Sequence, residues 1–260
     1  MNSIITVPIA NLYAEPDKTS TLIDEALMGW PIQILEEKGN FYHINTFYNY
    51  MAYVEKTDIT QNVNFEPNHV IIKNFADISQ GETVQHRTIT TLPFGAYVCV
   101  LKGGEKYSQI LMANGETGFI RTQFLKPYTI PLLTLPFQQD KESLRQNIVS
   151  DSLRYMETQY RWGGKTPIGI DCSGLTFMCY LLNGIIIYRD AVMKEGFPIK
   201  EIQKESLQKA DLIFWKGHVG MYIGDGLFIH SSDGNGGVAI DELEEKLNNN
   251  WEFVGYGSVF

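Results

Sequence analysis

The chain has few cysteines, few basic residues and no long apolar run, and each shortage excludes a class of protein. Its three cysteines, Cys99, Cys172 and Cys179, form no CxxC pair and fit neither a disulfide framework nor a zinc site. Lysine and arginine number 21 against 30 acidic residues, and the formal net charge of −9 argues against a nucleic-acid partner. No apolar stretch is long enough to cross a bilayer, so no membrane span is expected.

The N-terminus lacks a recognisable targeting signal. Residues 1–8 contain neither the basic region nor the apolar region of a secretory leader. The sequence as written therefore predicts a cytoplasmic protein, although a chain whose leader had been removed would give the same prediction. No metal or organic cofactor is implied.

The first half of the chain has the pattern of small β domains. With 44% hydrophobic and 20% charged residues, 260 residues are enough for two or three compact domains. Short β-type runs between turn residues fill this half, and residues 26–42 are echoed by residues 92–107 in a weak internal repeat. We expect two all-β domains, residues 1–62 and 63–127.

The second half has a different pattern. Three prolines interrupt apolar residues between Pro127 and Pro136, which is unsuitable for helix or strand, so residues 128–140 are expected to be a linker. Apolar residues then recur at the helical period from Lys141 to Tyr155 and again after Asp171. Helices followed by strand-like runs predict an α+β domain over residues 141–260.

Cys172 has the sequence context of a nucleophile. It follows Asp171, a good helix cap, and would lie in the first turn of the helix. The unpaired N–H groups and the macrodipole at that end favour a thiolate. Cys99, in a strand-like run, and Cys179, on an apolar helical face, are expected to be ordinary packed residues.

Two of the five histidines are candidates for the base. His218 and His230 lie on either side of the hairpin turn Gly224-Asp225-Gly226, which would bring both side chains to one face of the sheet. We expect His218 to act as general base and His230 to orient it. The other three, His43, His69 and His86, are expected to be packed or solvated.

Five motifs in order resemble the NlpC/P60 cysteine peptidases. They are Tyr160-Arg161-Trp162-Gly163-Gly164, Gly169-Ile170-Asp171-Cys172-Ser173-Gly174-Leu175, Ala210-Asp211-Leu212-Ile213-Phe214-Trp215, His218-Val219-Gly220-Met221-Tyr222-Ile223-Gly224 and Phe228-Ile229-His230-Ser231. The resemblance implies a papain-like core and a triad of Cys172, His218 and His230. It also implies hydrolysis of amide bonds in peptidoglycan peptides.

The resemblance assigns roles to three further residues. It implies that Tyr160 helps hold the tetrahedral oxyanion, with simple aromatic packing as the alternative. It implies that Asp171 and Ser173 bind the α-amino and carboxylate groups of the substrate, with a helix cap alone as the alternative for Asp171. Arg189 would meet a substrate carboxylate or, more ordinarily, be solvated.

The layout of the whole chain resembles the subgroup in which two bacterial SH3-like domains precede the peptidase. This implies cleavage between γ-D-glutamate and a diamino acid, either diaminopimelate or lysine, in murein peptides with a free N-terminal L-alanine, as in peptide recycling. In that subgroup the first SH3-like domain reads the free alanine.

One position departs from the pattern of the subgroup. Where a Gly-Glu pair is expected to offer a carboxylate to the substrate amine, this chain has Gly29-Trp30. Trp30 and Tyr50, or Tyr53 in place of Tyr50, are therefore expected to line the substrate pocket. The candidates to supply the missing acid are Glu25, Glu36 and Glu37.

Two other classes of function remain open from the sequence. One is a binding protein in which SH3-like modules accompany an inactive peptidase-like domain. The other is an acyltransferase on the same papain-like core, which would differ in what attacks the thioester.

Overall fold

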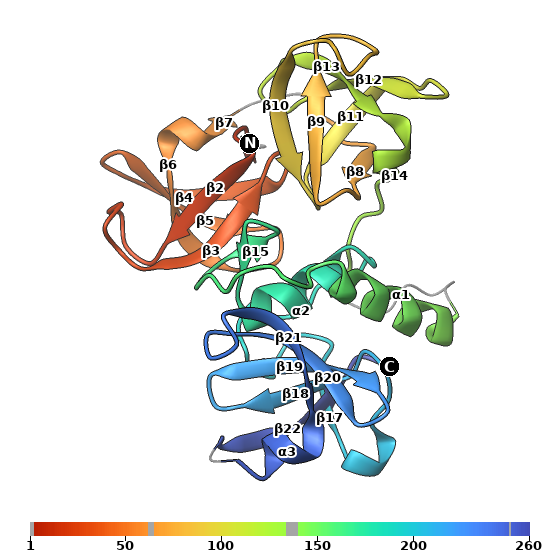
Figure 1. The fold of residues 1–260 in the computed structure, drawn as a ribbon. Helices are drawn as coiled ribbons and strands as arrows, with labels where there is room; N and C mark the ends of the chain where they lie inside the picture. The colour runs from red at the N-terminus through yellow and green to blue at the C-terminus, as the bar shows by residue number, and fades with distance from the viewer. Residues whose placement is uncertain (1–2, 62–64, 134–139, 250) are drawn as a thin grey trace. The chain divides into compact units, whose positions relative to one another are not determined.

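The computed structural model describes residues 3–61, 65–133, 140–249 and 251–260 (Figure 1). The chain divides into two compact units, Met1–Thr129 and Ile130–Phe260. In its described part, the first unit has only strands and two turns of 3-10 helix. The second unit combines helices with an antiparallel sheet.

The first unit begins with a seven-stranded antiparallel sheet in the order β3-β2-β6-β5-β4-β1-β7. A one-turn 3-10 helix, η1 (Lys56–Asp58), precedes its last strand. The strands are β1 (Ser3–Ile5), β2 (Ile9–Tyr13), β3 (Leu22–Leu27), β4 (Pro31–Lys38), β5 (Phe41–Thr46), β6 (Met51–Glu55) and β7 (Ile59–Gln61).

The second sheet of this unit has the corresponding order, β10-β9-β13-β12-β11-β8-β14. A 3-10 helix, η2 (Thr122–Phe124), again precedes the last strand. The strands are β8 (His69–Ile71), β9 (Phe75–Ser79), β10 (Thr88–Pro93), β11 (Tyr97–Lys102), β12 (Tyr107–Leu111), β13 (Thr117–Arg121) and β14 (Leu125–Pro127). The all-β character expected of the N-terminal half is confirmed.

The two sheets are copies of one pattern at a constant spacing of 66 residues. The N–H of Gly29 donates to the carbonyl of Ile5, as that of Gly95 does to Ile71, both at 2.9 Å. Near the 3-10 helices, the bond from Lys56 to Asn40 is likewise repeated 66 residues later, from Thr122 to Lys106. The weak sequence repeat therefore reflects equivalent backbone hydrogen bonds.

Equivalent turns of the two sheets contact each other. The N–H of Tyr97 donates to the carbonyl of Met28 at 2.9 Å, and the indole N–H of Trp30 donates to the carbonyl of Gly95 at 2.9 Å. Trp30 is 1% exposed, and its ring contacts those of Phe47, Tyr48 and Tyr97. These contacts tie the two sheets into one unit.

Gly29 allows this close approach, and Gly29→Ala should weaken it. Gly29 has φ +82°, and an added Cβ would lie 2.5 Å from the carbonyl oxygen of Tyr97. Strained backbone and the clash together should lower the free energy of unfolding of the first unit by roughly 2 to 4 kcal/mol. Gly115→Ala is the control, since its φ of +86° is equally strained but nothing lies within 4 Å of an added Cβ. Equal losses in chemical denaturation would contradict a special role for Gly29.

The linker prediction is only partly within the described residues, because residues 134–139 lie outside them. Leu132 forms a parallel bridge with Ile185, accepting from Ile186 at 2.7 Å and donating to Gly184 at 2.9 Å. This part of the chain is therefore attached along the second unit.

The second unit is built on an antiparallel sheet in the order β17-β22-β18-β19-β20-β21. Its strands are β17 (Lys200–Ile202), β18 (Leu212–Trp215), β19 (His218–Gly224), β20 (Leu227–Ser232), β21 (Gly237–Glu242) and β22 (Phe253–Ser258). A two-stranded ribbon of β15 (Lys165–Thr166) and β16 (Gly169–Ile170) precedes the nucleophile helix, and η3 (Lys204–Ser206) follows β17.

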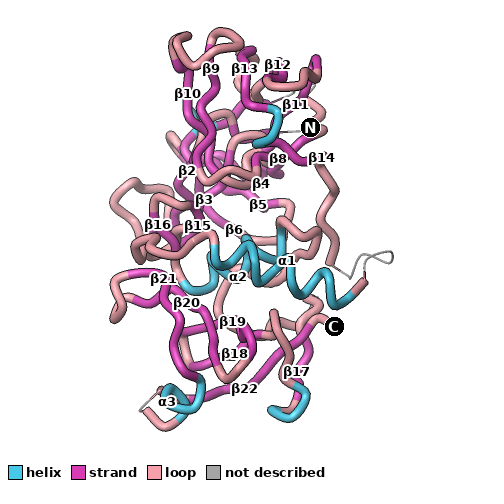
Figure 2. The backbone as a smooth tube through the Cα atoms, turned by 45° about the vertical axis from the view of Figure 1, so that its right-hand side comes forward, coloured by secondary structure: helices cyan, strands magenta, loops and turns pink. Residues whose placement is uncertain are grey.

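The helices of this unit are α1 (Lys141–Leu153), α2 (Cys172–Leu181) and α3 (Leu243–Leu247). Asp140 caps α1 by accepting from the N–H of Ser143, and α1 packs on α2 (Figure 2). Every residue of α2 is buried, and the helix contacts β19 and β20. The α+β class and both predicted helices are confirmed. No helix in the described ranges is long and apolar enough to span a membrane.

Candidate active site

Cys172 is the first residue of α2, as the sequence predicts. Asp171 is the cap, and its carboxylate accepts from the N–H of Gly174 at 2.6 Å. Cys172 is 6% exposed, and its thiol accepts hydrogen bonds from the backbone N–H groups of Val219 and Ser173. Because Val219 directly follows His218, the fold brings the nucleophile to the start of the predicted base strand.

Burial opposes the predicted preference for a thiolate at Cys172. Burial, together with the neighbouring Asp171 carboxylate, raises the pKa of Cys172 to about 11. The two backbone hydrogen bonds and Arg189 act in the opposite direction but do not outweigh burial. A sequence shows the helix end that favours the anion, but not the desolvation that opposes it.

The two histidines meet across the β19–β20 hairpin. Gly224, Asp225 and Gly226 all have positive φ in its turn, and Nε2 of His218 lies 2.8 Å from Nδ1 of His230. Burial is the main cause that lowers the pKa of His218 to about 3, and it lowers that of His230 as well. Burial thus disfavours the charged forms of the thiol and of both imidazoles.

The sequence reading missed a carboxylate behind this pair. Oδ2 of Asp241, on β21, lies 3.0 Å from Nε2 of His230. Lys246 on α3 and Asn235 before β21 also contact that oxygen, at 3.5 Å and 3.4 Å. The sequence did carry a signal for Asp241. The strand that follows His230 pairs with β20, and side chains alternate between the two faces along it, so a carboxylate on that strand could have been considered as a partner for His230.

Tyr160 lies on the wall of the pocket beside this pair. The pocket measures about 470 Å³ and is also lined by His218, Trp251 and Ser232. Burial and the nearby Cys172 thiol raise the pKa of Tyr160 to about 12. Its phenol therefore stays protonated at neutral pH and can donate a hydrogen bond to an oxyanion.

Asp171 and Ser173, predicted to bind substrate, are already engaged inside the protein. Oδ1 of Asp171 accepts from Gly174, from the Ser173 hydroxyl at 3.1 Å and from Nη1 of Arg189 at 3.0 Å. Oδ2 accepts from Gly163 at 2.8 Å and from Nη2 of Arg189 at 3.0 Å. Arg189 also donates to the Ser173 hydroxyl, at 2.8 Å.

Arg189 is 1% exposed, so it is not solvated. At that exposure its guanidinium does not face a substrate arriving from solution. The ion pair joins the cap of α2 to the turn that follows Tyr160. These internal hydrogen bonds give Asp171 and Ser173 a structural role. Their binding of substrate stays a prediction.

The two residues predicted on the first unit have local contacts of their own. Trp30 lies between the two sheets, which is sufficient reason for a large aromatic at that position. Tyr50 lies in the β5–β6 turn, where its N–H donates to the Thr46 hydroxyl at 3.0 Å. Their contact with substrate stays a prediction. Among the acids considered, Glu36 and Glu37 form exposed ion pairs with Lys38 and Lys56, and Glu25 is buried in β3.

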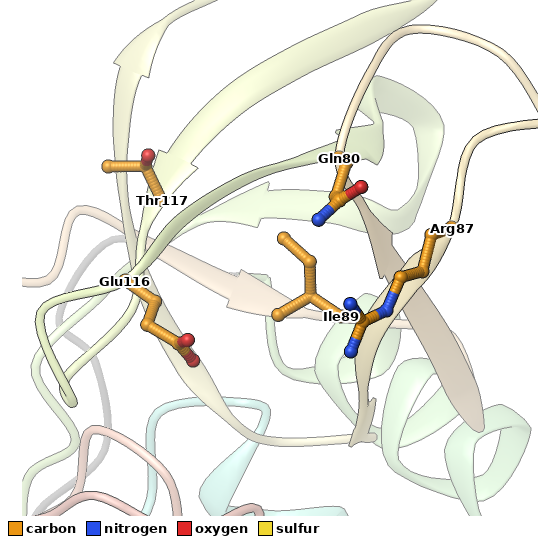
Figure 3. A pocket seen from close by; sticks show the side chains of 5 residues that line it. All are labelled: Gln80, Arg87, Ile89, Glu116 and Thr117. Atoms are coloured by element: carbon orange, nitrogen blue, oxygen red, sulfur yellow. The ribbon is translucent and has the colours of Figure 1, made fainter.

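A second pocket, of about 610 Å³, lies on the second sheet and has no nucleophile (Figure 3). It is lined by Gln80, Arg87, Ile89, Glu116 and Thr117. Within the described residues no group of His, Cys, Asp and Glu has the arrangement of a metal site. The pocket of about 470 Å³, which His218 and Tyr160 line, is the candidate active site.

A buried thiol at a helix N-terminus, next to an ordered pair of imidazoles and a phenol, defines the site of a cysteine peptidase. Two family models match the chain: the NlpC/P60 family over residues 157–254 and the bacterial SH3 domain over residues 9–60. Dipeptidyl-peptidase 6 of Lysinibacillus sphaericus is 41% identical over 257 residues, which is 95% of this chain and 93% of the relative. The chain belongs to the NlpC/P60 family, and the predicted cysteine peptidase of the peptidoglycan hydrolase type is confirmed.

Two further comparisons cover most of the chain. Gamma-D-glutamyl-L-lysine dipeptidyl-peptidase of Bacillus cereus is 26% identical over 244 residues, 84% of this chain and 70% of the relative. The crystal structure of an NlpC/P60 family protein from Bacillus cereus shares the fold, with TM-score 0.81, 23% identity and 98% of each chain covered. The SH3 match covers the first sheet; the second is SH3-like only through its shared strand order.

Breaking the Asp171–Arg189 pair should destabilise the second unit. Asp171→Asn removes the carboxylate charge that faces the buried guanidinium of Arg189, which costs about 3 to 5 kcal/mol. Adding Arg189→Met should recover part of this loss in chemical denaturation, because the buried positive charge that Asp171 balanced is then removed as well. A double variant less stable than Asp171→Asn alone would contradict this account.

The raised pKa of Cys172 predicts how alkylation depends on pH. Below about 11 the thiol form dominates, so the thiolate fraction should grow with each pH unit. Iodoacetamide labelling of the Cys172 peptide, followed by mass spectrometry in a Cys99→Ser background, should still accelerate between pH 8 and pH 10. A rate already constant from pH 6 to pH 8 would mean a preformed thiolate and would contradict the assignment.

Proposed function

We propose that the chain hydrolyses the γ-D-glutamyl–diamino acid bond of peptidoglycan peptides, with Cys172 as nucleophile. His218 takes the thiol proton as the sulfur attacks the scissile carbonyl, and later gives it to the leaving amine. Water then attacks the thioester, and the same imidazole serves as base. His230 holds the His218 ring in place throughout.

The developing oxyanion has two donors near the nucleophile. The N–H of Cys172 is at the first position of α2, where a helix offers no internal acceptor. The protonated phenol of Tyr160 is the second donor. Donors fixed in a water-poor site stabilise the tetrahedral state more than the substrate, and one such donor contributes about 100- to 1,000-fold in kcat.

The choice of bond rests on the relatives. Two relatives that cover most of this chain bear dipeptidyl-peptidase names, and one name specifies a γ-D-glutamyl-L-lysine bond. Cutting L-Ala-γ-D-Glu from a diamino acid releases a dipeptide. The observation that carries the proposal is a near full-length match to a dipeptidyl-peptidase. The contact between His218 and His230, and the hydrogen bond from the N–H of Val219 to the Cys172 thiol, support the assigned roles.

Release of an N-terminal dipeptide supports a requirement for a free amino group. A site that pairs the substrate ammonium with a desolvated acceptor loses a charge-assisted bond, about 2 to 5 kcal/mol, when that amine is acylated. Intact wall, in which the alanine nitrogen is tied to muramic acid, would then be a poor substrate. We propose free murein peptides as the physiological substrate.

The test compares L-Ala-γ-D-Glu-L-Lys with its N-acetylated form. The free tripeptide should be cut about 30-fold faster or more, the lower end of that energy range. Cys172→Ala should cut neither, which excludes a contaminating peptidase. Equal rates would overturn the free-amine requirement, and release of peptides from whole sacculi would replace it with wall hydrolysis.

The acyltransferase alternative differs only in the acceptor that attacks the thioester. Its product would carry an added amine rather than the elements of water, so the mass of the released dipeptide separates the two reactions. We propose water, the acceptor that a peptidase uses.

We propose the cytoplasm as the place of action, where peptides released from the wall would be recycled. Three free thiols suit a reducing compartment. Cell fractionation should recover the protein with soluble enzymes, and recovery with the wall would contradict this proposal.

A further inference from the structure

The contacts behind the catalytic histidine continue one residue further than a triad. Nε2 of His218 meets Nδ1 of His230, and Nε2 of His230 meets Oδ2 of Asp241. His230 is fully buried between them, so its ring is held at both nitrogens. The side chain of Asp241 is one-third exposed.

The shortest contacts place the protons in this chain in one way. The Asn235 amide lies 3.4 Å from both Nε2 of His230 and Oδ2 of Asp241, and in this placement it donates to the carboxylate. A carboxylate only accepts, so Nε2 of His230 must carry the hydrogen that faces Asp241. A neutral imidazole has one N–H, which leaves Nδ1 of His230 as an acceptor. His218 must therefore donate from Nε2, and its Nδ1 is left with a free lone pair.

We propose that Asp241 is a positioning residue that acts through His230 to fix the tautomer in which His218 presents Nδ1 as the proton acceptor for Cys172. In the opposite arrangement a bare Nε2 of His230 would face the carboxylate at 3.0 Å, lone pair against lone pair. That arrangement would also leave Nδ1 of His218 protonated and unable to take the thiol proton. The inference uses only the cysteine peptidase chemistry and does not depend on which peptide is cut.

The charged and aromatic groups around Asp241 hold this arrangement. The Lys246 ammonium lies 3.5 Å from Oδ2 of Asp241 and 3.8 Å from the centre of the Trp251 ring. That ring stands edge-on to His218, with centroids 4.6 Å apart. Lys246 thus contacts both the Asp241 carboxylate, which holds His230, and the Trp251 indole, which packs against His218.

Lys246 also helps to keep His218 neutral. Burial is the main cause that lowers the pKa of both histidines, and the Lys246 charge acts in the same direction. The negative charge of Asp241 opposes it. Asn235, the other polar group at Oδ2, is uncharged.

The decisive variants separate orientation from charge. Asp241→Ala removes the acceptor and should lower kcat roughly 100-fold or more with KM nearly unchanged, since Asp241 does not line the pocket. Asp241→Asn should keep kcat within about tenfold of wild type, because Lys246 and Asn235 both donate toward Oδ2 and select the amide oxygen there. Glu242→Ala is the matched control, an exposed carboxylate one residue away on β21, and should leave kcat unchanged.

Alkylation of Cys172 gives a readout that needs no peptide substrate. At pH 7 Asp241→Ala should react more slowly than wild type, because proton transfer to His218 is impaired. Toward pH 10 the two rates should converge, because hydroxide then removes the thiol proton. A defect of the same size at every pH, or none at pH 7, would overturn the proposal.

Nitrogen-15 NMR of the histidines tests the tautomers in the unaltered protein, even if Asp241→Ala does not fold. Both His218 and His230 should show a protonated Nε2 and an unprotonated Nδ1, with assignments from His218→Gln and His230→Gln. A protonated Nδ1 on His230 would overturn the proposal. Equal loss of kcat in Asp241→Asn and Asp241→Ala would also overturn the proposal, because the negative charge of Asp241, and not its orientation of His230, would then determine kcat.

Discussion

The carboxylate of Asp171 is the interaction on which the rest of the site depends. It caps the nucleophile helix, accepts from the turn after Tyr160 and pairs with a guanidinium that is almost wholly buried. Five hydrogen bonds to one carboxylate offset the cost of burying its charge. Asp171 thus connects the helix that begins at Cys172 with the turn that follows Tyr160, and it does so without needing to touch the substrate.

The base is positioned by an independent part of the fold. A tight hairpin sets His218 against His230, and the next strand and helix bring Asp241 and Lys246 behind them. Helix and hairpin meet where the Cys172 thiol accepts from the N–H of Val219. Burial raises the pKa of the thiol and lowers that of the imidazole, so it opposes the charged form of each.

Local patterns in the sequence predicted what local physics decides. Helical periodicity predicted α1 and α2, and the Gly-Asp-Gly turn predicted the hairpin. The motif order predicted the family, and the roles of Cys172, His218 and Tyr160 stay predictions. The errors and omissions concern long-range burial. The solvated reading of Arg189 was wrong, burial opposes the thiolate predicted at Cys172, and Asp241 was missed, because each depends on neighbours 11 to 47 residues away in the chain.

The most direct test of the account is to identify the acyl-enzyme. Protein quenched in acid during turnover of L-Ala-γ-D-Glu-L-Lys should carry the L-Ala-γ-D-Glu acyl group on the proteolytic fragment that contains Cys172. The same acyl group on any other residue, or dipeptide release by a protein without the Cys172 thiol, would contradict the central claim.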